Sequence, residues 1–427
     1  MRNSMRWLGI LGLMLLVVVG CQESTPTSSD SGDGSTETVV QDSALAILEA
    51  TPMDESFAVN AALDDEHAAK ARELIDGAMN FLIANRDADG AWSMDYEGQQ
   101  LYQSAMTGMV LRGVLADPRL DVNTPEVKGA FDVMLSHQKD KDGGIYERDK
   151  GNYSTSLAVM ALAMAAEEDG GYQPALDRAV GYLRGQVIMP GSKTPSGEEI
   201  TEDHVYGGGV SYGSHERPDL SNVSMNMEAL HEAGVDGDDP SMQAMLAFVT
   251  RMQNLSETNT LAVAAEGPND GGSFYAVAVR DGIIEAESKA GDAENGGLRS
   301  YGSMTYAGFK SMLYANVDKE DPRVRGAYNW IRRYWTLETN PNMPHVQSEQ
   351  GLYYYYHVFA KALRANGEAE IVDLDGEPHN WREELIDALS ERVNEDGSWT
   401  GDPRWFEGDP VLVTGYVLNA LREATAP

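Results

Sequence analysis

Residues 129–146 read GAFDVMLSHQKDKDGGIY, and this stretch decides the fold. In its first half, apolar residues such as Phe131 and Leu135 recur at the spacing that places them on one face of an α-helix. Its second half contains Asp142-Gly143-Gly144, a turn signal, because glycine adopts the left-handed backbone of tight turns without steric cost. Residues 153–166 follow and are rich in small and apolar side chains, which predicts a second helix. The stretch therefore predicts a helical hairpin.

The same unit recurs along the chain. Three further turns read Asp89-Gly90-Ala91-Trp92, Asp270-Gly271-Gly272-Ser273-Phe274 and Asp396-Gly397-Ser398-Trp399. The segments typical of the second helix are residues 102–115, 153–166, 220–233, 301–315, 352–365 and 411–424. Connections such as Ala116-Asp117-Pro118 start the next outer helix, with aspartate as the N-cap and proline at the first helical position. Because one helix pair cannot bury its own apolar faces, we expect the pairs to close into a two-layer ring.

Several of these residues resemble known families. Gly129-Ala130-Phe131, followed by Gln138 and Asp142-Gly143-Gly144, is similar to the QW-type repeat of squalene and terpenoid cyclases, and residues 77–92 form a looser copy. Residues 217–222 and 350–356 resemble segments of bacterial exported proteins that carry prenyltransferase and squalene oxidase repeats. The resemblance implies an all-α fold, an α6/α6 toroid of helical hairpins like those of terpenoid cyclases and protein prenyltransferases.

The N-terminus has the pattern of an export signal. Two arginines within residues 1–6 precede an apolar run at residues 7–19, which is too short to span a bilayer. Val18-Val19-Gly20-Cys21 resembles the lipobox of bacterial lipoproteins, which implies removal of a signal peptide at residues 1–20 and lipidation of Cys21. We therefore expect a protein held by a lipid anchor in the cell envelope, facing the periplasm or the exterior.

Composition divides the rest of the chain. Residues 21–63 are predicted to be a disordered tether, because small and polar residues dominate up to Ser43, and residues 64–427 to be a single toroid domain. The formal charge of −36 would repel phosphate backbones, so nucleic acid is not expected as a partner. The same charge fits either a cationic partner or the solubility of an exported surface.

Long insertions fall between an outer helix and its inner partner, at residues 190–218, 255–299 and 337–349. The second insertion contains Asp281-Gly282 between two alternating segments, which predicts a small β-hairpin over residues 275–287. The Asp-Gly turns and the starts of the inner helices lie at one end of such a ring. We expect a pocket at that end with the insertions as its rim, although tolerated surface insertions would give the same pattern.

Polar and aromatic residues gather where the inner helices begin. An aromatic-lined hole with a few polar groups suits a hydrophobic or a glycan ligand. Four consecutive tyrosines cannot all face it, and we expect Tyr353, Tyr356 and His357 to share one stripe and Tyr354 another. The predicted ligand-binding residues are Tyr102, Asn152, Tyr153, Asn222, Tyr301, Tyr353, Tyr356 and His357. The alternative is that these side chains seal the core of the ring.

Catalytic motifs are sparse. A cyclase needs an aspartic acid kept protonated in an apolar pocket, and Asp219 is the candidate, with helix capping as the alternative. Residues 236–239 match the cyclase signature Asp-x-Asp-Asp, but they belong to a connection at the far end. Cys21 is taken by lipid, and His204, His215 and Glu216 in an insertion are weak zinc ligands. We therefore expect neither a metal nor a cofactor.

These observations favour an exported, lipid-anchored toroid that binds a hydrophobic, isoprenoid-like or glycan small molecule in a central tyrosine-lined pocket. A terpenoid cyclase or prenyl transferase-type enzyme is the first alternative, because the resemblance suggests it. A protein-interaction scaffold is the second, and it would have a solid core and a broad apolar surface patch in place of a hole.

Overall fold

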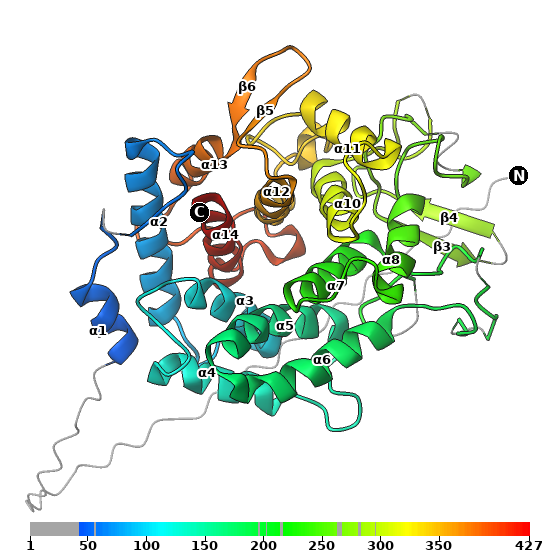
Figure 1. The fold of residues 1–427 in the computed structure, drawn as a ribbon. Coiled ribbons are helices and arrows are strands. Elements are labelled where there is room, and N and C mark those ends of the chain that lie inside the picture. The colour runs from blue at the N-terminus through cyan, green and yellow to red at the C-terminus, as the bar shows by residue number, and fades with distance from the viewer. Residues whose placement is uncertain are drawn as a thin grey trace, which may run out of the picture. The chain divides into compact units, whose positions relative to one another are not determined.

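The computed structural model describes residues 42–54, 57–194, 197–201, 203–213, 217–262, 267–280, 283–294 and 296–427. Its inner helices are α3 (Gln103–Leu115), α5 (Gly151–Glu168), α7 (Leu220–Glu232), α10 (Gly302–Tyr314), α12 (Leu352–Asn366) and α14 (Pro410–Thr425). Their outer partners are α2 (Asp65–Ala84), α4 (Pro125–Ser136), α6 (Gln173–Gln186), α8 (Pro240–Arg251), α11 (Pro322–Arg333) and α13 (Trp381–Ser390). Each inner helix packs against the next, and α14 returns to α3, so the inner ring closes (Figure 1). The α/α toroid predicted from the sequence is confirmed.

The Asp-Gly turns are joined to the inner helices by threonine. In four repeats, the second residue after the turn glycine donates its backbone N–H to a threonine Oγ1 near the start of the inner helix. The pairs are Trp92 with Thr107 at 3.1 Å, Ile145 with Thr155 at 2.9 Å, Ser273 with Thr305 at 3.0 Å, and Trp399 with Thr414 at 3.2 Å. The turn glycine needs its conformation, since Gly143 has φ +82° and an added Cβ would lie 2.5 Å from the Arg178 carbonyl oxygen.

Charged side chains fill the ring toward the C-terminal ends of the inner helices. Glu228 of α7 is fully buried between Lys310 of α10 and Lys361 of α12, and it forms an ion pair with each. Lys361 also reaches Glu232 at 2.9 Å, and Arg112 of α3 pairs with Glu232 at 2.7 Å. We call these five residues the central ion network. It ties four of the inner helices together, and each buried charge has an opposite charge beside it.

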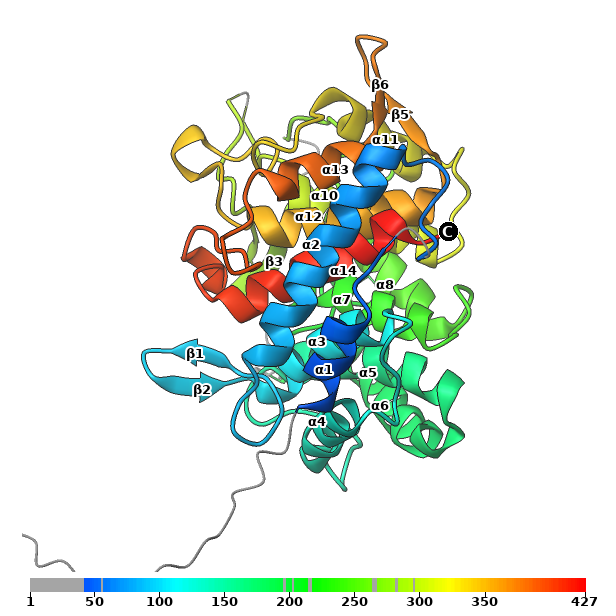
Figure 2. The same cartoon turned by 90° about the vertical axis from the view of Figure 1, so that its left-hand side faces the viewer.

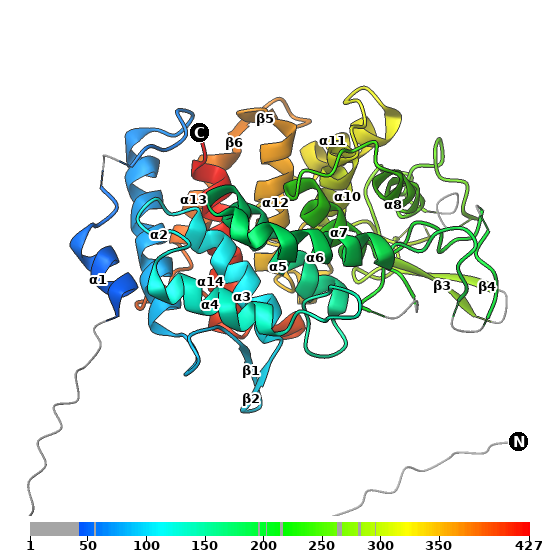
Figure 3. The same ribbon diagram turned by 60° about the horizontal axis from the view of Figure 1, so that its bottom comes forward.

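Among the described residues, three antiparallel β-hairpins lie in the connections between helices. They are β1 (Met94–Tyr96) with β2 (Gln99–Leu101), β3 (Ala276–Arg280) with β4 (Ile283–Glu287), and β5 (Glu370–Val372) with β6 (Pro378–Asn380). The β3–β4 hairpin was predicted, whereas the other two were not. Figure 2 shows β1–β2 projecting from the body, and Figure 3 shows β1–β2 below α3 at the bottom and β3–β4 at the right-hand edge.

The segment before residue 64 differs from expectation where the structure describes it. Helix α1 (Ser43–Ala50) lies within the predicted tether, with Asp42 capping its N-terminus. Ser43 donates from both its backbone nitrogen and its hydroxyl to Glu126 of α4, while Ala44 and Leu48 are buried. The few apolar residues here therefore find a surface on which to pack. The signal peptide and Cys21 lie outside the described residues, and no helix among those described is long and apolar enough to cross a membrane.

Candidate functional site

A cavity of about 420 Å³ opens at the Asp-Gly end of the ring. All the inner helices contribute to its lining from their N-terminal halves, through Tyr102, Ala105, Met106, Tyr153, Ser154, Leu157, Ser221, Tyr301, Ser303, Met304, Tyr354, Leu412 and Tyr416. Residues of the connecting segments complete the lining, namely Met94, Lys150, Gly351, Tyr212, Tyr275, Lys289, Trp405, Phe406 and Glu407. The pocket lies at the end that the sequence predicted, and its volume falls in the range of roughly 300–1,000 Å³ found for small-molecule sites.

Three hydroxyl groups form a chain across the cavity wall. The Tyr153 hydroxyl of α5 is hydrogen-bonded to Ser221 of α7, and Ser221 Oγ lies 3.1 Å from the Tyr354 hydroxyl of α12. Burial raises the pKa of Tyr354 to about 12, and burial also raises the pKa of Tyr153 well above its usual range. Both phenols are therefore neutral, and both of their hydroxyls are already hydrogen-bonded to Ser221.

Two insertions supply a second wall. Tyr212 stacks on Tyr153 with ring centroids 5.7 Å apart, and the Lys150 ammonium lies 3.6 Å from the Tyr212 ring centroid. The Lys289 ammonium lies 4.4 Å from the ring centroid of Tyr275. This wall combines aromatic faces with two cations, an arrangement stabilised by the attraction between a cation and a ring face.

Glu407 is the carboxyl group in the described lining. Its side chain is 1% exposed, Oε1 accepts a hydrogen bond from the Tyr354 backbone N–H at 2.8 Å, and Oε2 has no partner among the described residues. Burial raises the pKa of Glu407 to about 8, although hydrogen bonds from the start of α12 oppose the shift. The carboxyl group is therefore mostly protonated at pH 7.

The loop before Glu407 brings two aromatic rings to the mouth. Trp405 and Phe406 have φ values of +56° and +69°, a left-handed conformation that side chains adopt at a cost. The Phe406 ring contacts Tyr96 of β1 edge-on at 5.7 Å. Trp405 packs on Gly351, where an added Cβ would lie 3.0 Å from the indole. Exposed fractions of 37% for Trp405 and 41% for Phe406 place both rings at the boundary with solvent.

The structure separates the predicted ligand-binding residues into two groups. Tyr102, Tyr153 and Tyr301 line the cavity. Asn152 and Asn222 do not, because the Asn152 amide donates to the Asn222 side chain at 3.0 Å within the contact between α5 and α7. Their amides are used to join two inner helices.

Helix α12 presents a different side to the cavity than expected. Tyr354 lines the cavity, whereas Tyr353 and Tyr356 do not. The Tyr356 hydroxyl donates to the Leu337 carbonyl at 2.5 Å, and the two rings of Tyr353 and Tyr356 meet edge-on. Tyr356 turns away because the segment after α11 offers it an acceptor, and Tyr353 packs against the Tyr356 ring. His357 is buried beside Tyr416 with centroids 5.3 Å apart, and burial holds its pKa well below the usual range.

Asp219, the predicted catalytic acid, is the N-cap of α7. Its Oδ1 accepts from the Asn222 backbone N–H and its Oδ2 from the Asn222 amide, both at 2.9 Å. It is 2% exposed and does not line the cavity, although burial raises its pKa. The capping alternative accounts for this geometry. Asp239 likewise caps α8 through the Ser241 N–H at 2.9 Å, beyond the C-terminal end of α7.

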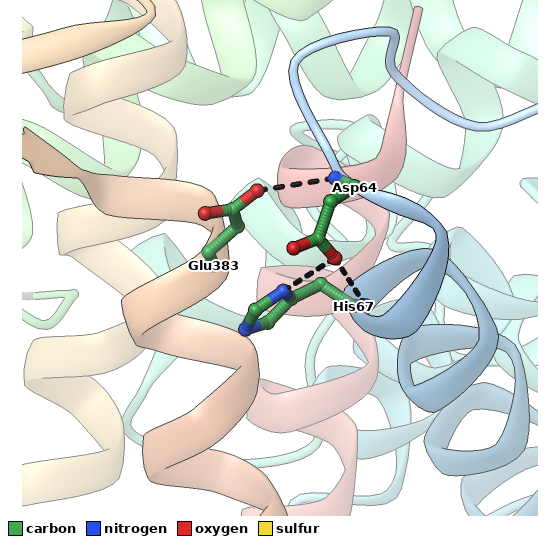
Figure 4. Close-up of side chains that lie close together, drawn as sticks. All are labelled: Asp64, His67 and Glu383. Carbon is green, nitrogen blue, oxygen red and sulfur yellow. Dashed lines mark hydrogen bonds and ion pairs between the residues drawn. The ribbon is translucent and has the colours of Figure 1, made fainter.

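One cluster of metal-ligand type lies among the described residues, away from the cavity, at Asp64, His67 and Glu383 (Figure 4). His67 Nδ1 is 2.7 Å from Asp64 and Nε2 is 3.3 Å from Asp387, so both ring nitrogens are engaged. Glu383 accepts from the Asp64 backbone N–H at 3.1 Å. These bonds cap α2 and join it to α13, which explains the cluster without an ion. Of the weak zinc ligands, His215 and Glu216 lie outside the described residues.

The sequence analysis did not predict which residues of the connecting segments line the cavity. Met94, Tyr212, Tyr275, Lys150, Lys289 and residues 405–407 were not predicted. The insertions had been expected at the rim, but nothing in their pattern distinguishes the side chains that point inward. Tyr416 was detectable, since it lies two turns after the start of α14 on the side of Leu412.

No family model matches the sequence, and no curated protein matches it significantly. Solved structures match across the ring. The GH76A alpha-1,6-mannanase from Salegentibacter sp. HEL1_6 is 12% identical, with 84% of this chain and 98% of that chain covered and a TM-score of 0.53. A beta-1,3-1,4-glucanase from Paenibacillus sp. X4 is 10% identical, with 85% and 94% covered and a TM-score of 0.53. The type II terpene cyclase MstE from Scytonema is 13% identical, with 83% and 98% covered and a TM-score of 0.48. At these identities, the mannanase and the glucanase share the α/α toroid fold with this chain, and the fold alone.

Proposed function

We propose that this protein binds a largely apolar, isoprenoid-like small molecule in the central cavity. The observation that supports the proposal is the state of the polar groups in the lining. Tyr153, Ser221 and Tyr354 are bonded to one another, and Glu407 accepts from the backbone. A buried ligand hydroxyl without a partner loses its hydrogen bonds to water, so such a wall favours an apolar ligand.

The apolar part of the lining fits the same ligand. Three methionines and two leucines line the cavity together with the tyrosines, namely Met94, Met106, Met304, Leu157 and Leu412. Methionine side chains adapt to irregular apolar shapes, and aromatic rings bury a large area at small entropic cost. The described lining contains no amide or guanidinium side chain, the groups that commonly fix a sugar by paired hydrogen bonds.

A cavity-filling variant tests the proposal. Ala105 lines the cavity from the first turn of α3, so Ala105→Trp should occupy the space while the ring stays folded. We expect the variant to lose at least tenfold in affinity for the neutral probe N-phenyl-1-naphthylamine, measured by fluorescence titration, with the far-ultraviolet circular dichroism unchanged. The exposed Thr51→Trp substitution is the control. Equal affinity in the wild type and Ala105→Trp would place the probe elsewhere and end the proposal.

Glycan binding is the second candidate, and the exposed rings of Trp405 and Phe406 at the mouth favour it, because sugar faces pack on aromatic rings. Glycoside hydrolysis commonly uses a pair of carboxyl groups, and the described lining contributes Glu407. Extraction of the purified protein followed by mass spectrometry separates the candidates, since an apolar ligand partitions into organic solvent and a glycan does not. A cyclase or transferase would in addition convert the extracted compound.

A further inference from the structure

The charge of the cavity lining is opposite to that of the chain. The whole sequence carries a formal charge of −36, yet the charged side chains of the described lining are Lys150, Lys289 and Glu407. Because burial raises the pKa of Glu407 to about 8, this carboxyl group does not cancel a lysine at pH 7. The lining therefore has a net positive charge inside an acidic protein.

The two lysines lie over neighbouring rings of one wall. Lys150 is above Tyr212 and Lys289 is above Tyr275, at 3.6 and 4.4 Å from the ring centroids. The hydroxyls of these two tyrosines interact with each other, and this interaction raises the pKa of Tyr275 in addition to the effect of burial. Lys150 is the N-cap of α5, whose N-terminal end adds a partial positive charge, and Lys289 lies over the neighbouring tyrosine ring of the same wall.

The lysines differ in their partners. Lys289 forms an ion pair with Glu287 of β4, and Glu287 also pairs with Arg217. Lys150 has no carboxylate within ion-pair distance among the described residues. Its ammonium lies over the face of the Tyr212 ring. Of the two lysines of this wall, Lys150 is the one without a counter-charge among the described residues. Its ammonium can therefore form an ion pair with a ligand that carries a single negative charge.

We infer that the ligand is a single-chain amphiphile whose apolar body lies in the cavity and whose terminal carboxylate binds Lys150 at the mouth. This inference rests on the proposed function, since it assigns the polar end of the same apolar ligand. The ammonium and carboxylate form a charge-assisted hydrogen bond at the edge of an apolar site, where water screens it less than at a free surface. The tyrosine ring beneath Lys150 holds the ammonium in place.

Two ligands that differ in their terminal group test the inference. Dodecanoate and dodecanol have the same chain length, and each is titrated below its aggregation limit to displace N-phenyl-1-naphthylamine from the intact protein. We expect dodecanoate to displace the probe at about tenfold lower concentration, with an advantage that shrinks as salt rises. Lys150→Met keeps the apolar stem and should reduce the advantage to less than about twofold, leaving dodecanol unaffected.

Lys139→Met is the matched control, because Lys139 also lies over a tyrosine ring, at 5.1 Å from the Tyr146 centroid, but does not line the cavity. It should keep the full advantage of dodecanoate. Equal displacement by both ligands in the wild type, or an advantage that survives Lys150→Met, overturns the inference. A failure of the proposed function looks different, since then Ala105→Trp leaves the affinity for the probe unchanged.

Discussion

Glu407 shows how burial sets the chemistry of a single side chain. Its carboxyl group lies at the start of α12, where the Tyr354 N–H favours the ionised form, yet loss of water dominates. The resulting pKa of about 8 compares with an ordinary value of 4.5. No cation pairs with Glu407 among the described residues, so the protonated acid is the form that this part of the fold accommodates at neutral pH.

The pH dependence of stability should reveal this group. Because the folded-state pKa is raised above the unfolded value, the stabilisation due to Glu407 is fully present below about pH 4.5 and is lost as pH rises toward about 8. Glu407→Gln keeps an acceptor for the Tyr354 N–H without a charge. We expect the variant to be more stable than the wild type at pH 8.5 by on the order of 1–4 kcal/mol, with a small difference at pH 4.5. Urea unfolding at both pH values measures this.

The control for Glu407 is Glu391→Gln, because the Glu391 side chain is 71% exposed. Its unfolding curves should match those of the wild type at both pH values. If the free energy of unfolding of Glu407→Gln has the same pH dependence as that of the wild type, the Glu407 carboxyl group is ionised in the folded protein. Its negative charge then cancels one of the two lysines of the cavity lining.

At the scale of elements, hydrogen bonds to threonine attach each of the four Asp-Gly turns to an inner helix. Each threonine Oγ1 accepts a hydrogen bond from the backbone N–H of the second residue after the turn glycine. The hydroxyls of Thr107 and Thr155 also donate to the backbone carbonyl of that same residue, at 3.2 Å. The turn is thus fixed to the inner helix of its own pair. This explains why a threonine recurs near the start of four inner helices.

Removal of one threonine hydroxyl should cost stability through a single unsatisfied N–H. Thr155→Val preserves the shape of the side chain but leaves the buried Ile145 N–H without an acceptor. We expect a loss of about 1–3 kcal/mol in the free energy of unfolding, measured by denaturant titration. Thr51→Val, at an exposed position, should change it by less than about 0.5 kcal/mol. A loss at Thr155 no larger than at Thr51 would mean that water reaches the Ile145 N–H.

The sequence predicted the elements better than it predicted which of their sides face the cavity. Helix spacing recurs in every pair and the Asp-Gly turn in four of them, so the inner and outer layers were predictable. On α12, the pattern of four tyrosines indicates separate stripes but not their targets. Those depend on distant acceptors, such as the carbonyls of Thr336 and Leu337, which bind Tyr355 and Tyr356. Trp405 and Phe406 were missed because their left-handed backbone is imposed by the surrounding contacts.

At the scale of the molecule, lipid attachment is the remaining prediction. The motif Val18-Val19-Gly20-Cys21 leads us to propose that a lipid on Cys21 holds the protein in the cell envelope. Cys21→Ser should move the protein from the membrane fraction to the soluble fraction. Immunoblotting of the two fractions measures this. Gln22→Ser is the control and should remain with the membranes. Retention of Cys21→Ser at the wild-type level would contradict the lipid anchor.

The central ion network has a kinetic consequence for whatever the cavity holds. Glu228, Lys310 and Lys361 are at most 2% exposed and occupy the ring below the cavity, so the route through the ring is blocked at that end. A ligand held in the cavity, as proposed, would therefore enter and leave by the same opening. One molecule would have to depart before another arrives, and at saturating concentration the rate of exchange would equal the rate of departure. A toroid blocked in this way would release its ligand on the side from which the ligand entered.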